Sequence, residues 1–283
     1  MIPDPRALLK KHGLAAKKSW GQNFLVEEKI YDAIVARTVA EPADWVVEIG
    51  AGLGTLTARL CAAAPDGRVL AVERDRDMAA VLRAEWGSLP NLEIREENAL
   101  TFDYAEAAAR AGRRLAVAGN LPYQIASPLL FHLLEHRRHL SRAVVMLQKE
   151  MADRILAGPG TKTYGALGVM IALYADAKPV VRARAGAFHP APRVDSTVLA
   201  LEPLPAGTRV PVDEKRYHQV VHAAFGQRRK TLRNALRSLG PAELVDAALA
   251  RTGIDGQRRG ETLSIPEFAA LANAFGAIDA GAP

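Results

Sequence analysis

The sequence has little cysteine and no apolar run long enough to cross a membrane. Its one cysteine, Cys61, excludes a disulfide within the chain, argues against a cysteine-based zinc site and suits a reducing compartment. The longest apolar stretch, residues 166–175, has about half the length that a bilayer requires. Residues 1–4 do not begin a signal-peptide core. We therefore expect a cytoplasmic protein without membrane contact and without a bound metal.

The composition is that of a globular protein with an excess of basic residues. The chain has 283 residues, of which 49% are hydrophobic and 24% charged, enough for one large domain and a small one. A net charge of +6 permits a polyanionic partner. Prolines and glycine gather between residues 203 and 211 and indicate a linker. We therefore expect a larger domain over residues 1–204 and a helical domain over residues 205–283.

Short apolar runs alternate with helical patterns through the larger domain. Their lengths and boundaries are typical of buried parallel strands. A longer apolar pattern after Gly165 predicts another strand. In a doubly wound α/β sheet of this kind, ligands bind beyond the carboxyl ends of the strands. The short runs are residues 45–50, 68–73, 91–95, 115–119, 143–147 and 197–201.

Three of these predicted strands end in residues suited to a nucleoside. Gly50 and Gly52 let the backbone approach a ligand, but Thr55 replaces the sixth-position glycine of a dinucleotide fingerprint, which disfavours a dehydrogenase. Glu73 ends the next strand, where a carboxylate can accept both hydroxyl hydrogens of a ribose. Asn98 follows a third strand, and its amide could bond an adenine edge or simply cap a turn.

The tetrapeptide Asn120-Leu121-Pro122-Tyr123 follows the strand at residues 115–119. It offers an amide side chain, backbone carbonyls stiffened by proline, and an aromatic face. Together these could hold a planar base that carries an exocyclic amine. The alternative is a plain strand-to-helix turn with a buried tyrosine.

Two further features point towards nucleic acid. Phe188 lies in the proline-rich loop of residues 186–196, either as a packing anchor or as a stacking platform. Beyond the linker, a helical pattern with an apolar face over residues 221–239 predicts a basic stripe, which contacts RNA phosphates or forms a solvated face. The stripe consists of Arg229, Arg233 and Arg237 at four-residue spacing, with Arg228 and Lys230 beside it.

Together these features indicate an S-adenosylmethionine-dependent methyltransferase with a Rossmann-like class I sheet. The sequence closely resembles the KsgA/RsmA family of small-subunit ribosomal RNA adenine dimethyltransferases, from about residue 14 to about residue 270. Several long motifs occur in the family's order, which makes chance agreement untenable. The motifs are residues 18–25, 48–54, 120–123, 188–196 and 225–234.

The resemblance implies roles for the residues that would hold S-adenosylmethionine. Asn23 and Leu25 close over the cofactor, Gly50 approaches its methionine part, and Glu73 holds the ribose. The family usually has aspartate where this chain has Asn98, next to the adenine amine. An asparagine carbonyl oxygen can still accept that hydrogen bond, so we expect binding to survive.

The resemblance also implies the acceptor and the chemistry. Asn120 and Tyr123 match the family's catalytic motif, and Phe188 matches its second aromatic residue. The expected reaction transfers two methyl groups to each of two adjacent adenosines in the 3'-terminal hairpin of 16S rRNA, on a small ribosomal subunit precursor, by a monomeric enzyme. The alternatives are a large-subunit rRNA adenine methyltransferase of the antibiotic-resistance type and a non-enzymatic RNA-binding assembly factor on the same fold.

Overall fold

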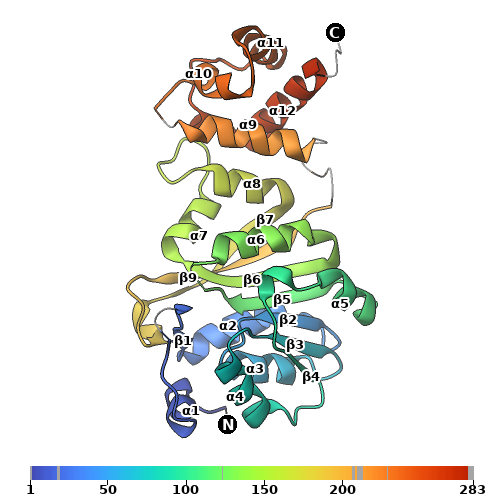
Figure 1. Cartoon of the computed structure of the whole chain (residues 1–283), viewed down its shortest axis with the longest axis vertical. Helices are drawn as coiled ribbons and strands as arrows, with labels where there is room; N and C mark the ends of the chain where they lie inside the picture. The colour runs from blue at the N-terminus through green and yellow to red at the C-terminus, as the bar shows by residue number, and fades with distance from the viewer. Residues whose placement is uncertain are drawn as a thin grey trace. The chain divides into compact units, whose positions relative to one another are not determined.

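The computed structural model describes residues 2–17, 20–122, 124–205, 208, 213–227 and 229–279. The chain divides into two compact units (Figure 1). Unit 1 contains Met1–Ala152 and Asp176–Pro203, and unit 2 contains Asp153–Ala175 and Leu204–Pro283. The sequence analysis placed residues 153–175 in the first domain, whereas in the structure they group with the C-terminal helices.

Unit 1 is built on a seven-stranded sheet in the order β4-β3-β2-β5-β6-β9-β7. The first five of these strands pair in parallel, and β9 pairs antiparallel to β6. The α/β class and the Rossmann-like sheet predicted from the sequence are therefore confirmed. The strands are β2 (Trp45–Ile49), β3 (Arg68–Val72), β4 (Leu92–Arg95), β5 (Leu115–Asn120), β6 (Leu140–Gln148), β7 (Ala175–Ala183) and β9 (Ser196–Pro203).

Helices cover this sheet, and a two-stranded ribbon joins distant parts of unit 1. The ribbon pairs β1 (Phe24–Leu25) with β8 (Phe188–His189). The helices before the last strands are α1 (Pro5–Lys11), α2 (Glu28–Thr38), α3 (Thr55–Ala63), α4 (Arg76–Trp86), α5 (Tyr104–Ala111), α6 (Ala126–Glu135) and α7 (Lys149–Leu156), which continues into unit 2. Single 3-10 turns lie at Ala99–Thr101 (η2), Arg137–His139 (η3) and Ala185–Ala187 (η4).

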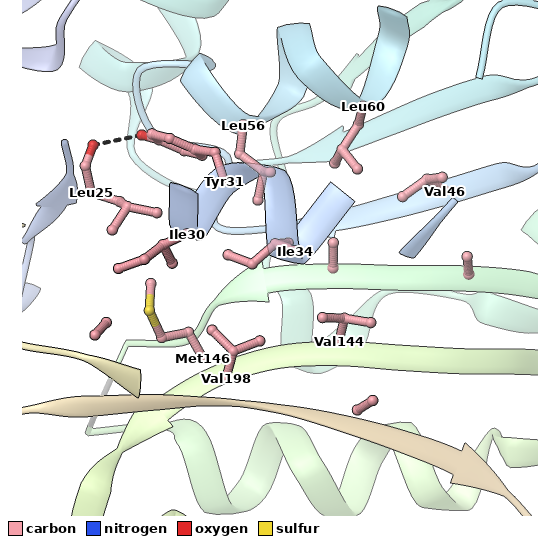
Figure 2. Packing of buried hydrophobic residues seen from close by; sticks show 14 of the residues in the cluster. Leu25, Ile30, Tyr31, Ile34, Val46, Leu56, Leu60, Val144, Met146 and Val198 are labelled. Carbon is pink, nitrogen blue, oxygen red and sulfur yellow. Dashed lines mark hydrogen bonds between the residues drawn. The ribbon is translucent and has the colours of Figure 1, made fainter. Parts of the chain in front are cut away.

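Helix α2 forms the centre of the core on one face of the sheet (Figure 2). Its Ile30 and Ile34 lie toward the strands that carry Met146 and Val198, and all four side chains are buried. Tyr31, on the same helix, donates a hydrogen bond to the carbonyl oxygen of Leu25 at 2.6 Å. The core helix therefore fixes the position of strand β1.

Unit 2 is helical, and its apolar residues 166–174 form a helix rather than the predicted strand. A continuous apolar run suits a buried helix as well as a buried strand, so periodicity could not separate them. Helix α8 (Ala166–Tyr174) buries Val169 and Ile171, and Tyr217 of α9 (Glu214–Gly226) donates a hydrogen bond to the Val169 carbonyl oxygen at 3.2 Å. No helix among the described residues has the length and apolar character needed to span a membrane.

The sequence analysis predicted that the basic stripe lies on one helix, and this prediction is wrong. Helix α9 ends at Gly226 and α10 (Leu232–Leu236) is a separate helix. The helix is interrupted there because two backbone amides bond outside it. The Leu232 amide donates to the Arg258 carbonyl oxygen at 2.6 Å, and the Arg233 amide donates to the Gly256 carbonyl oxygen at 3.0 Å. Unit 2 continues with η5 (Arg237–Leu239), α11 (Ala242–Thr252), η6 (Gly260–Thr262) and α12 (Ile265–Asp279).

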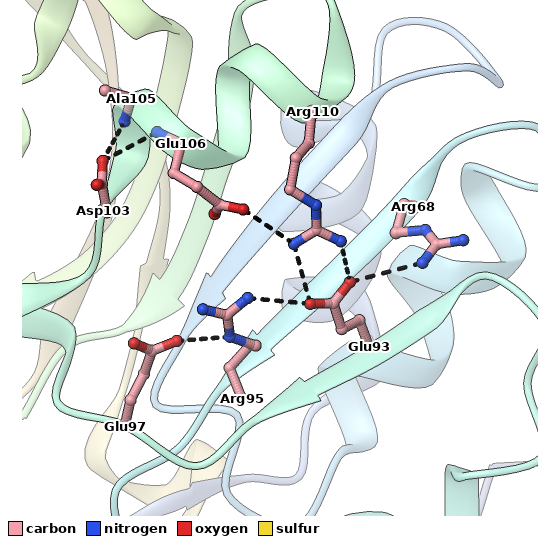
Figure 3. Close-up of polar contacts among 8 residues, drawn as sticks. All are labelled: Arg68, Glu93, Arg95, Glu97, Asp103, Ala105, Glu106 and Arg110. Carbon is pink, nitrogen blue, oxygen red and sulfur yellow. Dashed lines mark hydrogen bonds and ion pairs between the residues drawn. The ribbon is translucent and has the colours of Figure 1, made fainter.

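Charged side chains cover the edge strand β4 (Figure 3). Glu93 of β4 pairs with Arg110 at 2.6 Å, with Arg95 at 3.1 Å and with Arg68 at 3.5 Å. Hydrogen bonds from Arg110 and then Arg95 lower the pKa of Glu93 to about 2. Charges on an exposed edge also discourage pairing with another chain.

Glu93→Gln should lower stability at neutral pH and have little effect in acid. The depressed pKa of Glu93 means that its contribution is fully present above the ordinary carboxyl pKa of 4.5 and is lost as pH falls towards 2. Because the network is partly exposed, we expect a loss of about 1 kcal/mol in the free energy of unfolding at pH 7. Urea unfolding at pH 7, 4 and 3 measures this, and an equal loss at all three would contradict it.

Candidate functional site

The carboxyl ends of β2, β3 and β5 open onto one cavity in unit 1. Its volume is about 130 Å³, and Gly50, Glu73 and Asn120 line it together with residues 20–25. A second hollow of about 380 Å³ shares Trp20, Gly50, Glu73 and Pro122 with the first and extends to Asn98. Three of the predicted strand-end residues thus share one cavity, and Asn98 lies in the hollow that continues it.

Glycine is required in the turn after β2 for two reasons. Gly52 has φ +55°, in the left-handed region, and a Cβ there would lie 3.3 Å from the ring of Phe24. Gly54 has φ +78°, and a Cβ there would lie 2.3 Å from the Trp86 ring. The turn therefore leaves bare backbone facing the cavity, and helix α3 can begin directly at Thr55.

Backbone amides hold the Glu73 carboxyl group in place. The Gly52 amide donates to Oε2 at 2.8 Å and the Asp75 amide donates to Oε1 at 2.7 Å. Burial raises the pKa of Glu73, and these amide hydrogen bonds oppose the rise. Each carboxyl oxygen keeps a further lone pair, so Glu73 can still accept hydrogen bonds from a diol.

The Asn120 side chain is oriented by the N-terminal segment. Its Nδ2 donates to the Asn23 carbonyl oxygen at 3.0 Å, which leaves Oδ1 as an acceptor. The next residue, Leu121, is 1% exposed, and its amide donates to the Met146 carbonyl oxygen at 3.2 Å. Pro122 lines both hollows. Tyr123, the fourth residue of this motif, lies outside the described residues.

Strand β1 forms one wall of the cavity, and Phe188 lies behind that wall. Asn23 and Leu25 both line the cavity. Phe188 is paired with Leu25 in the β1–β8 ribbon, but its ring is 4% exposed and packs in the core with Ile34 and Met146. The ring therefore belongs to the core and not to the cavity lining, and it would have to become accessible before it could stack on a base.

Asn98 lines the second hollow with its carbonyl oxygen already engaged. Oδ1 accepts the Leu100 amide at 3.1 Å and caps the 3-10 turn η2. The sequence analysis predicts that this oxygen accepts a hydrogen bond from the adenine amine. It can do so only with its second lone pair, since the other atom of the amide, Nδ2, is a donor.

Glu48 and Trp20 are among the residues of the cavity lining that the sequence analysis did not predict. Glu48 is 2% exposed and accepts a hydrogen bond from the Thr57 hydroxyl. Burial, with the charge of Glu73 adding to it, raises the pKa of Glu48 to about 8. The signal was available, because an acid within an apolar strand just before a glycine turn is unusual. Trp20 lines both hollows, and its ring lies 5.5 Å from Lys17 Nζ.

The sheet and this site define a class of protein, the Rossmann-like S-adenosylmethionine-dependent methyltransferases. A solved dimethyladenosine transferase from Plasmodium falciparum is 26% identical, with a TM-score of 0.75 over 89% of this chain and 98% of that one. The solved 23S rRNA methyltransferase ErmE is 25% identical, with a TM-score of 0.68 over 90% of this chain and 100% of that one.

The chain belongs to the ribosomal RNA adenine dimethylase family, whose family model matches residues 13–276. Curated relatives are named ribosomal RNA small subunit methyltransferase A. The one from Myxococcus xanthus is 47% identical over 98% of this chain and 97% of its own length. The one from Anaeromyxobacter sp. is 48% identical over 97% of this chain and 98% of its own length.

Glu48→Gln should stabilise the free protein in alkaline solution. Because the pKa of Glu48 is raised to about 8, the folded state loses stability as pH rises from the ordinary value of 4.5 to about 8. Glutamine stays neutral and still accepts the Thr57 hydrogen bond. We expect nearly equal free energies of unfolding at or below pH 4.5 and an advantage of the variant that grows up to about pH 8 and then levels off. A pH-independent difference in urea unfolding would refute this.

Proposed function

We propose that this chain transfers methyl groups from S-adenosylmethionine to N6 of two adjacent adenosines in the 3'-terminal hairpin of small-subunit (16S) rRNA. Membership in the ribosomal RNA adenine dimethylase family supports the reaction, and the names of the curated relatives support the small subunit as substrate. The structural observation that carries the proposal is that Asn120 and Glu73 line one cavity. The reaction belongs in the cytoplasm, with the chain acting as a monomer.

The residues that line the two hollows suit the chemistry of the cofactor. The two hollows share Gly50 and Glu73, so one elongated ligand can occupy both. Glu73 would bind the ribose hydroxyls, bare backbone at Gly50 and Gly52 would admit the methionine part, and Asn98 would face the adenine. Asn23 and Leu25 would close the remaining side. When bound, S-adenosylmethionine supplies an electrophilic methyl group on a positively charged sulfur.

Asn120 prepares the acceptor amine. The lone pair of adenine N6 is delocalised into the ring, which makes it a poor nucleophile. If Asn120 Oδ1 and the Leu121 carbonyl oxygen each accept one N6 hydrogen, the nitrogen becomes more tetrahedral and its lone pair turns towards the methyl group. Orientation of two bound reactants in this way contributes roughly 7–11 kcal/mol to lowering a barrier. The methylated cation then releases a proton to water, so no strong base is needed.

The target base must leave its helix to reach Asn120. Unstacking costs a few kcal/mol, and stacking on Tyr123 would offset it, with Pro122 keeping the turn rigid. Phe188 is proposed as the second stacking surface. Because Phe188 is buried in the same core cluster as Ile34 and Met146, this role requires the β1–β8 ribbon to shift when RNA binds.

Unit 2 is proposed to contact the RNA backbone through Arg228, Arg229, Lys230, Arg233 and Arg237. The exposed residues of this set differ in their surroundings. Arg233 forms an ion pair with Asp246 inside unit 2, whereas Arg229 and Arg237 are exposed and carry the main expectation of phosphate contact. Arg228 lies outside the described residues. Unit 1 is then the catalytic unit.

The experiment that tests the proposal is methyl transfer to small subunits from a strain that lacks the modification, with the product nucleosides identified. Large subunits are assayed in parallel, because the structural likeness to ErmE makes large-subunit rRNA the competing substrate. We expect N6,N6-dimethyladenosine at two adjacent positions of the small subunit only. Cofactor binding without transfer to either subunit would favour a non-enzymatic assembly factor.

Asn120→Ala should abolish methyl transfer and spare cofactor binding. The acceptor for the N6 hydrogen is lost, while Glu73 and the glycine turn remain. We expect a fall of at least about 100-fold in kcat. Calorimetry should show a cofactor Kd within a few-fold of the parent, and an equal loss of both quantities would contradict the assignment.

Asn98→Asp should tighten cofactor binding by about 3- to 10-fold. One carboxylate oxygen can cap the Leu100 amide as Asn98 Oδ1 does, and the second can accept a hydrogen bond from the adenine amine. The dissociation constant from calorimetry measures the change. A substantial weakening would mean that Asn98 Nδ2 donates a needed hydrogen bond.

Arg229→Glu combined with Arg237→Glu should weaken RNA binding and reduce its salt dependence. Loss of two phosphate contacts lowers the slope of log K against log salt by about 2. Arg233→Glu should weaken RNA binding less than the double variant does, since Asp246 already pairs with Arg233. If the double variant leaves the slope unchanged, these residues do not contact RNA.

A further inference from the structure

Asp75 is a buried acid that the proposed reaction does not use. Its side chain is 2% exposed, and it follows Glu73 at the end of β3, where it caps helix α4. Both carboxyl oxygens are engaged by the N-terminal segment of unit 1. Lys17 Nζ lies 2.7 Å from Oδ1, and Gln22 Nε2 donates to Oδ2 at 2.8 Å.

Gln22 is held at both ends of its amide. While Nε2 donates to Asp75, Oε1 accepts the Lys17 amide at 2.9 Å. Neither atom can exchange places with the other, because the rotated amide would set a donor against the Lys17 amide and an acceptor against the Asp75 carboxylate. The Gln22 side chain therefore has one orientation, and it fixes the backbone that leads into Asn23.

The Asn23 carbonyl oxygen in turn selects the orientation of Asn120. A carbonyl oxygen only accepts hydrogen bonds, so the Asn120 amide must present Nδ2 to it, as it does at 3.0 Å. Oδ1 then faces the other way and can accept a hydrogen. If the Asn23 carbonyl moved away, the Asn120 amide could rotate and present its Nδ2 to adenine N6. Both groups are hydrogen-bond donors, so no hydrogen bond would form.

We propose that Asp75 is a positioning residue for methyl transfer, because by anchoring Lys17 and Gln22 it holds the Asn23 carbonyl oxygen against the Asn120 amide. The inference rests on the proposed role of Asn120 Oδ1 as acceptor of the N6 hydrogen. It links the acid next to the ribose-binding Glu73 to the group that prepares the acceptor, through a chain of hydrogen bonds within unit 1.

The ribose contact separates this role from a general effect on cofactor binding. Asp75 holds Glu73 through its backbone amide, at 2.7 Å, and not through its side chain. A change of the Asp75 side chain therefore leaves that hydrogen bond in place. Asparagine is also a good helix N-cap, so Asp75→Asn keeps the cap on α4.

The decisive experiment exchanges donor and acceptor between the two partners. Asp75→Asn sets two amide donors against each other, and Gln22→Glu sets two carboxylates against each other. In the double variant the introduced asparagine amide can donate to the introduced carboxylate, whose other oxygen accepts the Lys17 amide. Each single variant should lower kcat for methyl transfer to unmodified small subunits at least about 10-fold. The cofactor Kd should change by a clearly smaller factor, since Gln22 and Asn23 also line the cofactor cavity but Glu73 and the glycine turn remain in place.

The double variant should recover most of the lost kcat, which a merely destabilising effect would not produce. Asp77→Asn is the matched control: Asp77 also pairs with Lys17, at 2.7 Å, but Gln22 donates to Asp75, so kcat should stay within about 2-fold of the parent. Failure of the double variant to recover, or parallel losses of kcat and cofactor affinity, would overturn the proposal.

The outcome is separable from that of the proposed function. If Asn120→Ala abolishes transfer while Asp75→Asn and Gln22→Glu leave kcat unchanged, only the positioning role fails. If Asn120→Ala itself retains activity, the role of Asn120 fails and the positioning role fails with it. Gln22 lies outside any helix or strand, so Gln22→Glu can still test the positioning role if Asp75→Asn does not fold.

Discussion

Parallel pairing of β2 with β3 on one side and β5 on the other is the constraint on which the site depends. The register sets Ile49 opposite both Val72 and Gly119, so the three strands end at the same level. Whatever residue follows each strand is then delivered to one edge of the sheet. Gly50, Glu73 and Asn120 line a common cavity for this reason, although they are far apart in the chain.

Acidic groups are concentrated around that edge, and each is accommodated in a different way. Glu48 is kept neutral at physiological pH by burial. Glu73 accepts hydrogen bonds from two backbone amides, and Asp75 forms an ion pair with Lys17. Isolated charges would be costly at such sites, so every acid has a partner. Glu73 is held by neutral backbone amides, so its charge can still attract a positively charged ligand, which agrees with a sulfonium cofactor.

Local patterns were sufficient for much of the fold and part of the site. Strands β2, β3 and β5 are buried on both faces, and this burial is visible as short apolar runs. The glycines of the turn and the acid after β3 were predictable because each role needs one residue type. Asn23 and Leu25 were assigned to the site only through the family resemblance. Their own sequence pattern does not reveal that Asn23 contacts Asn120, which lies 97 positions away.

Features that depend on distant partners were missed. Helix α8 is apolar along its whole length, and such a run has no period that distinguishes helix from strand. The helical pattern after Gly226 was interrupted by backbone hydrogen bonds to residues 256 and 258. Phe188 has an aromatic ring in a stiff loop, but its burial is decided by β1, from the opposite end of the sequence.

The ribbon of β1 and β8 has a consequence for biosynthesis. Residues 24 and 25 are made long before their strand partners, residues 189 and 188. During translation, the side of the pocket that Asn23 and Leu25 form can therefore be completed only after residues 188 and 189 have been made. A nascent chain released before that point would carry the glycine turn and the ribose carboxylate with one wall missing, and so would lack a finished pocket.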